Sequence, residues 1–206
     1  MAEIFKIEDN CDKAVLSTKK LFYEGKVFIY PTDTLYGFGA NPYNEEAVQR
    51  ISKIKQRDES KNNILLLGSM ELLLNYVDIE NERHLDFLNE IWPNPVSVVL
   101  KLNRKTAAIL KQETAAFRIP NHRFCLKVLD ALKTPLISTS VNKSGQLPYV
   151  DPSQIIEDYS EEVDAIFYSV KLLNNSASTL IDLSAKEPII LREGKFQINE
   201  LINKYF

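Results

Sequence analysis

The chain has 206 residues, of which 45% are hydrophobic and 26% are charged, and its formal net charge is −3 at pH 7. This length and apolar content are sufficient for the core of one domain, and the acidic balance argues against a protein that coats nucleic acid, although it leaves a local basic cleft open. Two cysteines and two histidines are too few for a disulfide framework or a histidine-rich metal cluster.

The N-terminal residues are acidic and lack the apolar core of a signal peptide, and no run approaches the length of about 20 apolar residues that spans a membrane. We therefore expect a soluble, cytoplasmic protein without membrane contact.

Helices and short strands alternate in the first half of the chain. Asn44 is placed to cap a helix that starts at Glu45. Periodicity and turn residues predict further helices over 10–24, 69–76 and 81–91, and buried strands over 27–30 and 63–68.

Strands dominate the second half. The pattern predicts strands over 96–102, 115–119, 135–138, 165–168, 178–183 and 188–192, and helical segments over 105–111, 123–132, from Asp151 onward and near 198–203. Because several strands follow one another without an intervening helix, we expect an α/β fold, with α+β also open, built as a twisted mixed sheet flanked by helices. No repeat or linker-like segment is present, so the prediction is one domain over residues 1–206.

The strand over 27–30 ends at a proline, which has no N–H for a sheet ladder. Thr32, Asp33 and Thr34 follow at once, and two glycines come shortly after them. A strand that ends on hydroxyls and a carboxylate beside glycines is typical of ligand sites in α/β sheets. An ordinary polar turn explains the same residues equally well. Both interpretations remain open for this stretch alone.

A basic cluster follows the helix that starts at Glu45. On a continuing helix, Lys55 and Arg57 would lie about 200° apart and could not grip one ligand. In an extended segment, residues i and i+2 point to the same side. We therefore infer that the helix ends near Lys55, so that Lys55, Arg57 and Lys61 converge. Cations that complement the dipole of a solvated helix end are the alternative.

Other strand ends carry guanidinium or hydroxyl groups. Arg118 and Arg192 end two strands, and the segment 138–145 is rich in hydroxyl and amide donors but lacks the spacing of a Walker loop. No catalytic triad can be assembled, because Cys125 lies inside a predicted helix and His122 is placed to cap it. The remaining groups suit chemistry done by positioning and charge neutralisation, as at the phosphates of a nucleotide.

Taken in order, these segments resemble the YrdC/TsaC family of threonylcarbamoyl-AMP synthases, from about Lys26 to Gly194. The hallmark of that family, Lys-x-Arg followed far downstream by Ser-x-Asn, is matched by Lys55, Arg57, Ser140 and Asn142. Six segments carry the resemblance: Tyr-Pro-Thr-Asp-Thr-Leu-Tyr-Gly at 30–37, Lys-Gln-Arg at 55–57, Phe-Arg-Ile-Pro at 117–120, Ser-Thr-Ser-Val-Asn-Lys-Ser-Gly at 138–145, Ser-Thr-Leu-Ile-Asp at 178–182 and Leu-Arg-Glu-Gly at 191–194.

The resemblance implies a reaction in which L-threonine, bicarbonate and ATP give threonylcarbamoyl-AMP and pyrophosphate. Downstream threonylcarbamoyl-transfer proteins would then pass the activated carbamoyl group to the adenosine beside the anticodon of tRNA, with weak direct tRNA binding also open. The implied fold surrounds a deep, positively charged cavity. Mg²⁺ would accompany ATP, held by phosphates and water, and no metal ligands are expected from the protein.

The resemblance also implies the binding residues. Lys55 and Arg57 would be the catalytic pair, and Arg118 would pair with the carboxylate of threonine. The implied ATP-binding set is Lys55, Arg57, Thr114, Ser138, Ser140, Asn142 and Arg192. The implied threonine-binding set is Thr32, Thr34, Lys61, Arg118 and Ser178.

Two other functions remain open. An RNA-binding module could use the same basic cavity, but the acidic balance of the chain argues against it. A paralogue of the YciO type would keep the fold and act on a different substrate. Relatives of that type tend to lose the Ser-x-Asn element, which is intact here at Ser140 and Asn142.

Overall fold

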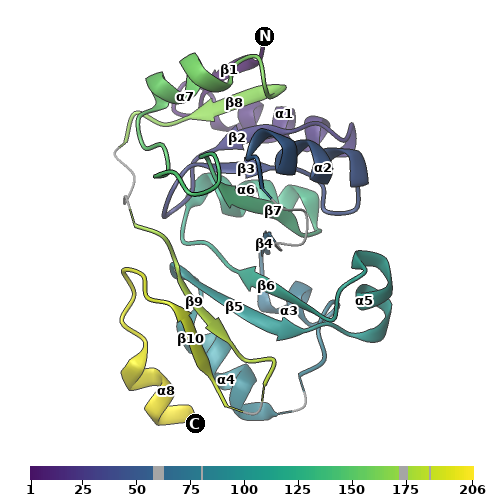
Figure 1. The fold of residues 1–206 in the computed structure, drawn as a ribbon, viewed down its shortest axis with the longest axis vertical. Helices are drawn as coiled ribbons and strands as arrows, with labels where there is room; N and C mark the ends of the chain where they lie inside the picture. The colour runs from purple at the N-terminus through teal and green to yellow at the C-terminus, as the bar shows by residue number, and fades with distance from the viewer. Residues whose placement is uncertain (58–62, 80, 172–175, 186) are drawn as a thin grey trace.

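The computed structural model describes residues 1–57, 63–79, 81–171, 176–185 and 187–206. These residues form ten strands in one sheet with the order β1-β8-β2-β3-β7-β4-β6-β5-β9-β10 (Figure 1). The strands are β1 (Glu3–Lys6), β2 (Phe28–Tyr30), β3 (Gly37–Gly39), β4 (Ile64–Leu66), β5 (Val96–Lys101), β6 (Thr114–Arg118), β7 (Leu136–Ser140), β8 (Ala165–Tyr168), β9 (Thr179–Asp182) and β10 (Ile189–Arg192).

The sheet is mixed. Strand β8 is parallel to β1 and β2, β4 is parallel to β6, and β5 is parallel to β9. The remaining neighbours are antiparallel, including β3 and β4 on the two sides of β7. The expected mixed α/β sheet with flanking helices is therefore confirmed.

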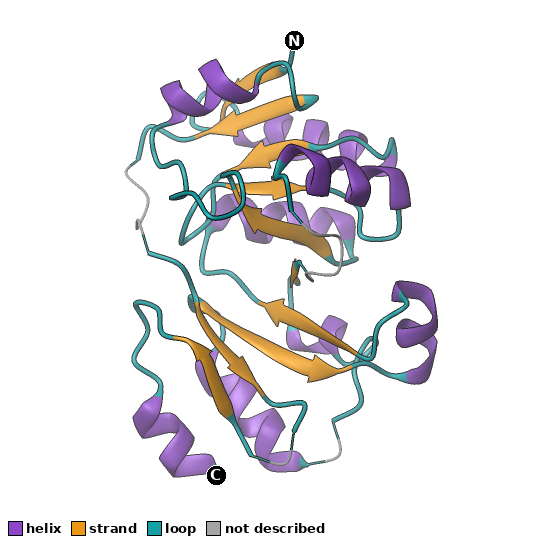
Figure 2. Ribbon diagram, in the orientation of Figure 1, coloured by secondary structure: helices purple, strands orange, loops and turns teal. Residues whose placement is uncertain are grey.

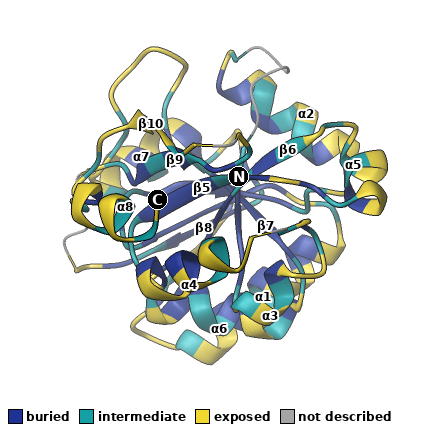
Figure 3. Ribbon diagram, turned by 90° about the horizontal axis from the view of Figure 1, so that it is seen from below, coloured by how far each residue is buried: buried dark blue, intermediate teal, exposed yellow. Residues whose placement is uncertain are grey.

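Helices cover the sheet on both faces (Figure 2). They are α1 (Cys11–Tyr23), α2 (Glu45–Ile54), α3 (Met70–Leu73), α4 (Glu82–Ile91), α5 (Arg104–Leu110), α6 (Arg123–Leu132), α7 (Pro152–Tyr159) and α8 (Asn199–Tyr205). Figure 3 shows α1 and α6 together on one side of the buried strands and α2 on the other. A smaller core cluster that includes Phe22, Phe28, Phe124 and Phe167 joins α1 and α6 to the sheet. No helix in the described ranges is long and apolar enough to cross a membrane.

Capping residues set most of the predicted helix starts. Asn44 accepts a hydrogen bond from the backbone N–H of Ala47 at 2.9 Å, as predicted for α2. Nδ1 of His122 accepts from the backbone N–H of Cys125 at 3.5 Å, and α6 has the predicted bounds. Because such a cap satisfies N–H groups that the helix leaves open, the Asn44 cap contributes about 1 kcal/mol.

Two strands were absent from the sequence prediction. The expected turn glycines Gly37 and Gly39 lie in β3, and neither has a positive φ. A Cβ on Gly39 would come within 2.4 Å of the Phe28 ring, so this glycine allows close packing between β2 and β3. Strand β1 was also missed, and β7 runs to Ser140 instead of ending at residue 138. Ser140 is therefore held by the sheet rather than by a loop.

Candidate active site

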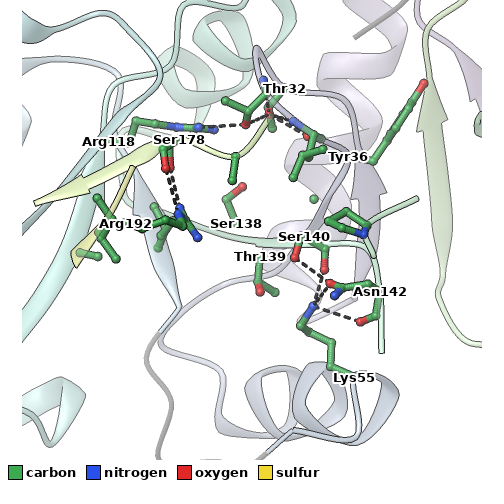
Figure 4. Close-up of a pocket in the computed structure, with 18 of the residues that line it drawn as sticks. Thr32, Tyr36, Lys55, Arg118, Ser138, Thr139, Ser140, Asn142, Ser178 and Arg192 are labelled. Carbon is green, nitrogen blue, oxygen red and sulfur yellow. Dashed lines mark hydrogen bonds between the residues drawn. The ribbon is translucent and has the colours of Figure 1, made fainter. Parts of the chain in front are cut away.

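A cavity of about 430 Å³ opens where the turn after β2, the end of α2, the end of β7 and the start of β9 meet. Figure 4 shows its polar side chains converging from these separate elements. The cavity is lined by ten of the residues predicted from the sequence, namely Thr32, Thr34, Lys55, Arg57, Arg118, Ser138, Ser140, Asn142, Ser178 and Arg192. Four of these are cationic, and no carboxylate is among the described residues of the lining.

Thr114 is predicted for the site but does not line this cavity. It is the first residue of β6, on the same face as Ala116 and Arg118, which do line the cavity. Its role at ATP stays a prediction. Lys61 lies outside the described residues.

Arg118, Thr34 and Thr32 form a buried hydrogen-bonded chain. Nη1 of Arg118 donates to Oγ1 of Thr34 at 3.0 Å, and the two threonine hydroxyls are 3.0 Å apart. Thr32 donates its hydroxyl proton to the carbonyl of Leu35 at 2.7 Å. Oγ1 of Thr32 also accepts from the backbone N–H groups of Thr34 at 3.1 Å and of Leu35 at 3.3 Å, which occupy its two lone pairs. The proton of Thr34 is therefore not committed to Thr32, and Oγ1 of Thr34 keeps one lone pair as an acceptor. Nε of Arg118 is buried without a hydrogen-bond partner among the described residues, so the cluster has unused donor capacity.

Arg192 and Ser178 form a second cluster. The guanidinium of Arg192 donates to the carbonyl and to Oγ of Ser178, both at 3.0 Å. Ser97, which is fully buried, places its hydroxyl 2.9 Å from that of Ser178. Burial lowers the pKa of Arg192, and the charge of Arg118 acts in the same direction. The two guanidiniums therefore form a positive region that would favour an anion.

Lys55 and Arg57 converge as predicted. Helix α2 ends at Ile54, and Gln56 has a φ of 48°, which turns the chain. Both side chains consequently line the same cavity. Burial, followed by the charge of Arg57, lowers the pKa of Lys55 to about 8. Burial also lowers the pKa of Arg57.

Sequence reasoning left some participants unassigned. Asp33 pairs with Arg118, with Nη2 and Oδ1 3.4 Å apart. A charged residue between two threonines at a strand end was the available signal. For Ser97, the signal is a hydroxyl inside the otherwise apolar start of β5. Tyr36 also lines the cavity, and its hydroxyl donates to the carbonyl of Ser169 at 3.2 Å.

Comparisons with known proteins identify the family of this chain. The family model Sua5/YciO/YrdC, whose description is "Telomere recombination", matches residues 20–194. The chain belongs to the Sua5/YciO/YrdC family. It is 32% identical over 179 residues to a protein of Vibrio campbellii named threonylcarbamoyl-AMP synthase, a match that covers 85% of this chain and 96% of that protein.

Solved structures of family members share the fold. P. abyssi Sua5 complexed with L-threonine matches with a TM-score of 0.87 and 26% identity, over 98% of this chain and 60% of that chain. E. coli YciO matches with a TM-score of 0.85 and 26% identity, over 98% of this chain and 100% of that chain. The chain thus spans about three fifths of that Sua5 protein and the whole of YciO.

Proposed function

We propose that this protein is an L-threonylcarbamoyladenylate synthase, which forms threonylcarbamoyl-AMP and pyrophosphate from L-threonine, bicarbonate and ATP. One observation carries the proposal: two different polar groupings share a single cavity. Arg118 and Thr32 lie at one end, and Lys55 with Asn142 lies at the other (Figure 4). Thr34 contacts both Arg118 and Thr32. The relatives support it, because one is named for this reaction and another was solved with L-threonine.

The threonine half would consist of Arg118, Thr34, Thr32 and Ser178. A buried guanidinium is suited to a substrate carboxylate, because its planar fork can make two parallel charge-assisted hydrogen bonds. The acceptor lone pair of Thr34 would face a donor of the amino acid, either its hydroxyl or its amino group. Lys61 stays a prediction for this half.

The ATP half would consist of the cations and the turn after β7. Arg57 and Arg192 would neutralise the phosphates, and Ser138, Ser140 and Asn142 would supply polar contacts. Thr114 would extend this set along β6. Whether Lys55 itself contacts ATP stays a prediction.

This reaction requires few acid or base groups from the protein. The amine of threonine attacks the carbon of bicarbonate, and water leaves to give a carbamate. A carbamate oxygen then attacks the α-phosphorus of ATP, the bond to the β-phosphate oxygen breaks, and pyrophosphate departs. Buried guanidiniums stabilise the charge that develops on the phosphates, and positioning of the two substrates supplies the remainder.

Magnesium would bind through the nucleotide. Among the described residues, no group of three or more His, Cys, Asp or Glu side chains could hold a metal ion. Mg²⁺ would instead be held by phosphate oxygens and water and would neutralise phosphate charge when bound. Downstream threonylcarbamoyl-transfer proteins would use the product on tRNA, with tRNA itself contacting this chain weakly.

Pyrophosphate release tests the proposal directly. We expect release from ATP to require both threonine and bicarbonate, and each substrate omission to abolish it. We also expect threonine and ATP each to raise the melting temperature, because each binds the folded state. Pyrophosphate release that is unchanged without threonine would refute the synthase function.

A YciO-type paralogue is the second candidate, and the full-length match to E. coli YciO favours it. It predicts ATP binding without dependence of turnover on threonine. An RNA-binding module predicts tight, salt-sensitive RNA binding and no threonine-dependent turnover. The same assays, run with and without tRNA at two salt concentrations, separate these three functions.

A further inference from the structure

The ammonium group of Lys55 is fully engaged by the turn that follows β7. A lysine ammonium has three N–H donors. They reach the carbonyl of Ser140, the carbonyl of Asn142 at 3.1 Å and Oδ1 of Asn142 at 2.8 Å (Figure 4). Lys55 is only 3% exposed. In this arrangement all three donors are used, so a phosphate oxygen could bind only by displacing one of these contacts.

The same turn is attached to Lys55 from a second direction. The backbone N–H of Ser144 donates to the carbonyl of Lys55 at 2.7 Å. Asn142 also accepts from Oγ of Ser140 and donates to the carbonyl of Gln146, both at 2.7 Å. The end of α2 and the turn over 140–146 therefore form one hydrogen-bonded unit with Lys55 at its centre. This unit connects Lys55 of the Lys-x-Arg motif with Ser140 and Asn142 of the Ser-x-Asn motif.

We propose that Lys55 is a positioning residue that holds the turn over 140–146 in the shape that receives ATP, while Arg57 and Arg192 meet the phosphates. This inference rests on the proposed function and deepens its ATP half. A guanidinium matches phosphate oxygens better than a buried ammonium with engaged donors, because its fork presents pairs of parallel N–H groups. Lys55 thus acts through the turn.

The protonation state of Lys55 controls its hydrogen bonds to the turn over 140–146, which we call the clamp. Arg57 is the charged group that lowers its pKa together with burial, while Ser140, Asn142 and the ring of Phe38, 5.5 Å away, are neutral. With a pKa of about 8, Lys55 loses a proton as the pH rises through the mildly alkaline range. The neutral amine has two N–H groups and a lone pair that faces carbonyl oxygens, so the turn loosens.

Amide hydrogen exchange in the ligand-free protein distinguishes two roles of Lys55, as the residue that holds the turn over 140–146 or as a direct ligand of phosphate. Lys55→Met keeps the length of the side chain and removes its donors, and Arg57→Met is the matched control. We expect amides over 141–149 to exchange about 10- to 100-fold faster in Lys55→Met, as the loss of charge-assisted hydrogen bonds predicts, and at the wild-type rate in Arg57→Met. Should Lys55→Met fail to fold, Asn142→Ala removes one anchor of the clamp and should accelerate the same amides.

ATP affinity provides the second measurement, taken without threonine or bicarbonate. Lys55→Met should weaken ATP binding about tenfold. Wild-type affinity should fall as the pH rises from about 7 to about 9, and this dependence should vanish in Lys55→Met. Unchanged exchange over 141–149 with lost ATP affinity would make Lys55 a direct phosphate ligand and overturn the proposal, as would no change in either quantity. Faster exchange in a protein without threonine-dependent turnover would refute the proposed function and leave the clamp standing.

Discussion

The carboxylate of Asp33 lies 3.4 Å from the guanidinium of Arg118, and both side chains are more than nine-tenths buried. The other oxygen of Asp33 accepts from the backbone N–H of Asn121 at 3.1 Å. Asp33 therefore supplies the counter-charge for the cation that we assign to the threonine carboxylate. It also fixes the turn after β2 to the segment that follows β6.

Replacing Asp33 with Asn should leave the buried charge of Arg118 without a counter-charge. Removing one partner of a buried ion pair costs about 3–5 kcal/mol, so the free energy of unfolding should fall by that order. Saturating threonine should recover part of the loss, because its carboxylate offers a replacement charge. Urea unfolding with and without threonine measures both effects. Glu45→Gln, which breaks the exposed pair with Lys111, is the control and should unfold like wild type.

Arg118→Lys should preserve the charge beside Asp33 but lose the planar fork. We expect the KM for threonine to rise about 10- to 100-fold while the KM for ATP changes by less than about twofold. Initial rates of pyrophosphate release at varied threonine and varied ATP give both constants. An equal rise in both constants would contradict the assignment of Arg118 to the amino acid.

The sequence allowed good prediction of elements that local chemistry specifies. Helix α6 was predicted with its full bounds because His122 caps it and apolar residues repeat at helical spacing. Strand β3 escaped prediction because Gly37 and Gly39 normally favour turns, and only contacts with Phe28 and Ser138 explain them. Strand β1 escaped because its partner β8 lies about 160 residues away. Sequence periodicity carries no information about such distant pairing.

The candidate site shows the same division. Convergence of Lys55 and Arg57 was one of two interpretations of their spacing. The structure bears it out, through a left-handed turn at Gln56 rather than the extended segment that the prediction assumed. The hydrogen-bond and ion-pair partners of the site residues could not be predicted, because they depend on distances across the sheet. Asp33 pairs with a residue 85 positions away, and Lys55 with residues 85 and 87 positions away. These contacts become visible only when the strands are assembled.

Gly194 lies beside the start of β9, where no side chain fits. A Cβ at this position would come within 2.3 Å of the backbone nitrogen of Thr179 and 2.6 Å of the carbonyl carbon of Ser178. Gly194→Ala should therefore displace Ser178, destabilise the fold by about 1–3 kcal/mol and raise the KM for threonine. Thermal unfolding and initial rates check this. Gly68→Ala, whose Cβ would meet Leu129 at 3.3 Å, should have a smaller effect on stability and none on the KM.

The hydroxyl of Thr34 accepts from the buried guanidinium of Arg118, and this makes it the sharpest probe of the threonine half. The second lone pair of this hydroxyl remains for a ligand donor, and its proton is not committed to Thr32, whose oxygen already accepts from two backbone N–H groups. Thr34→Ser keeps these hydrogen bonds and should keep the wild-type KM for threonine. Thr34→Val removes them at similar volume and should raise that KM about tenfold, as expected for a lost hydrogen bond to a charged group. The KM for ATP should be unaffected in both variants. If Thr34→Ser raises the KM and Thr34→Val does not, the methyl contact rather than the hydroxyl governs threonine binding, and the hydrogen bond from Arg118 to Thr34 has no part in recognition.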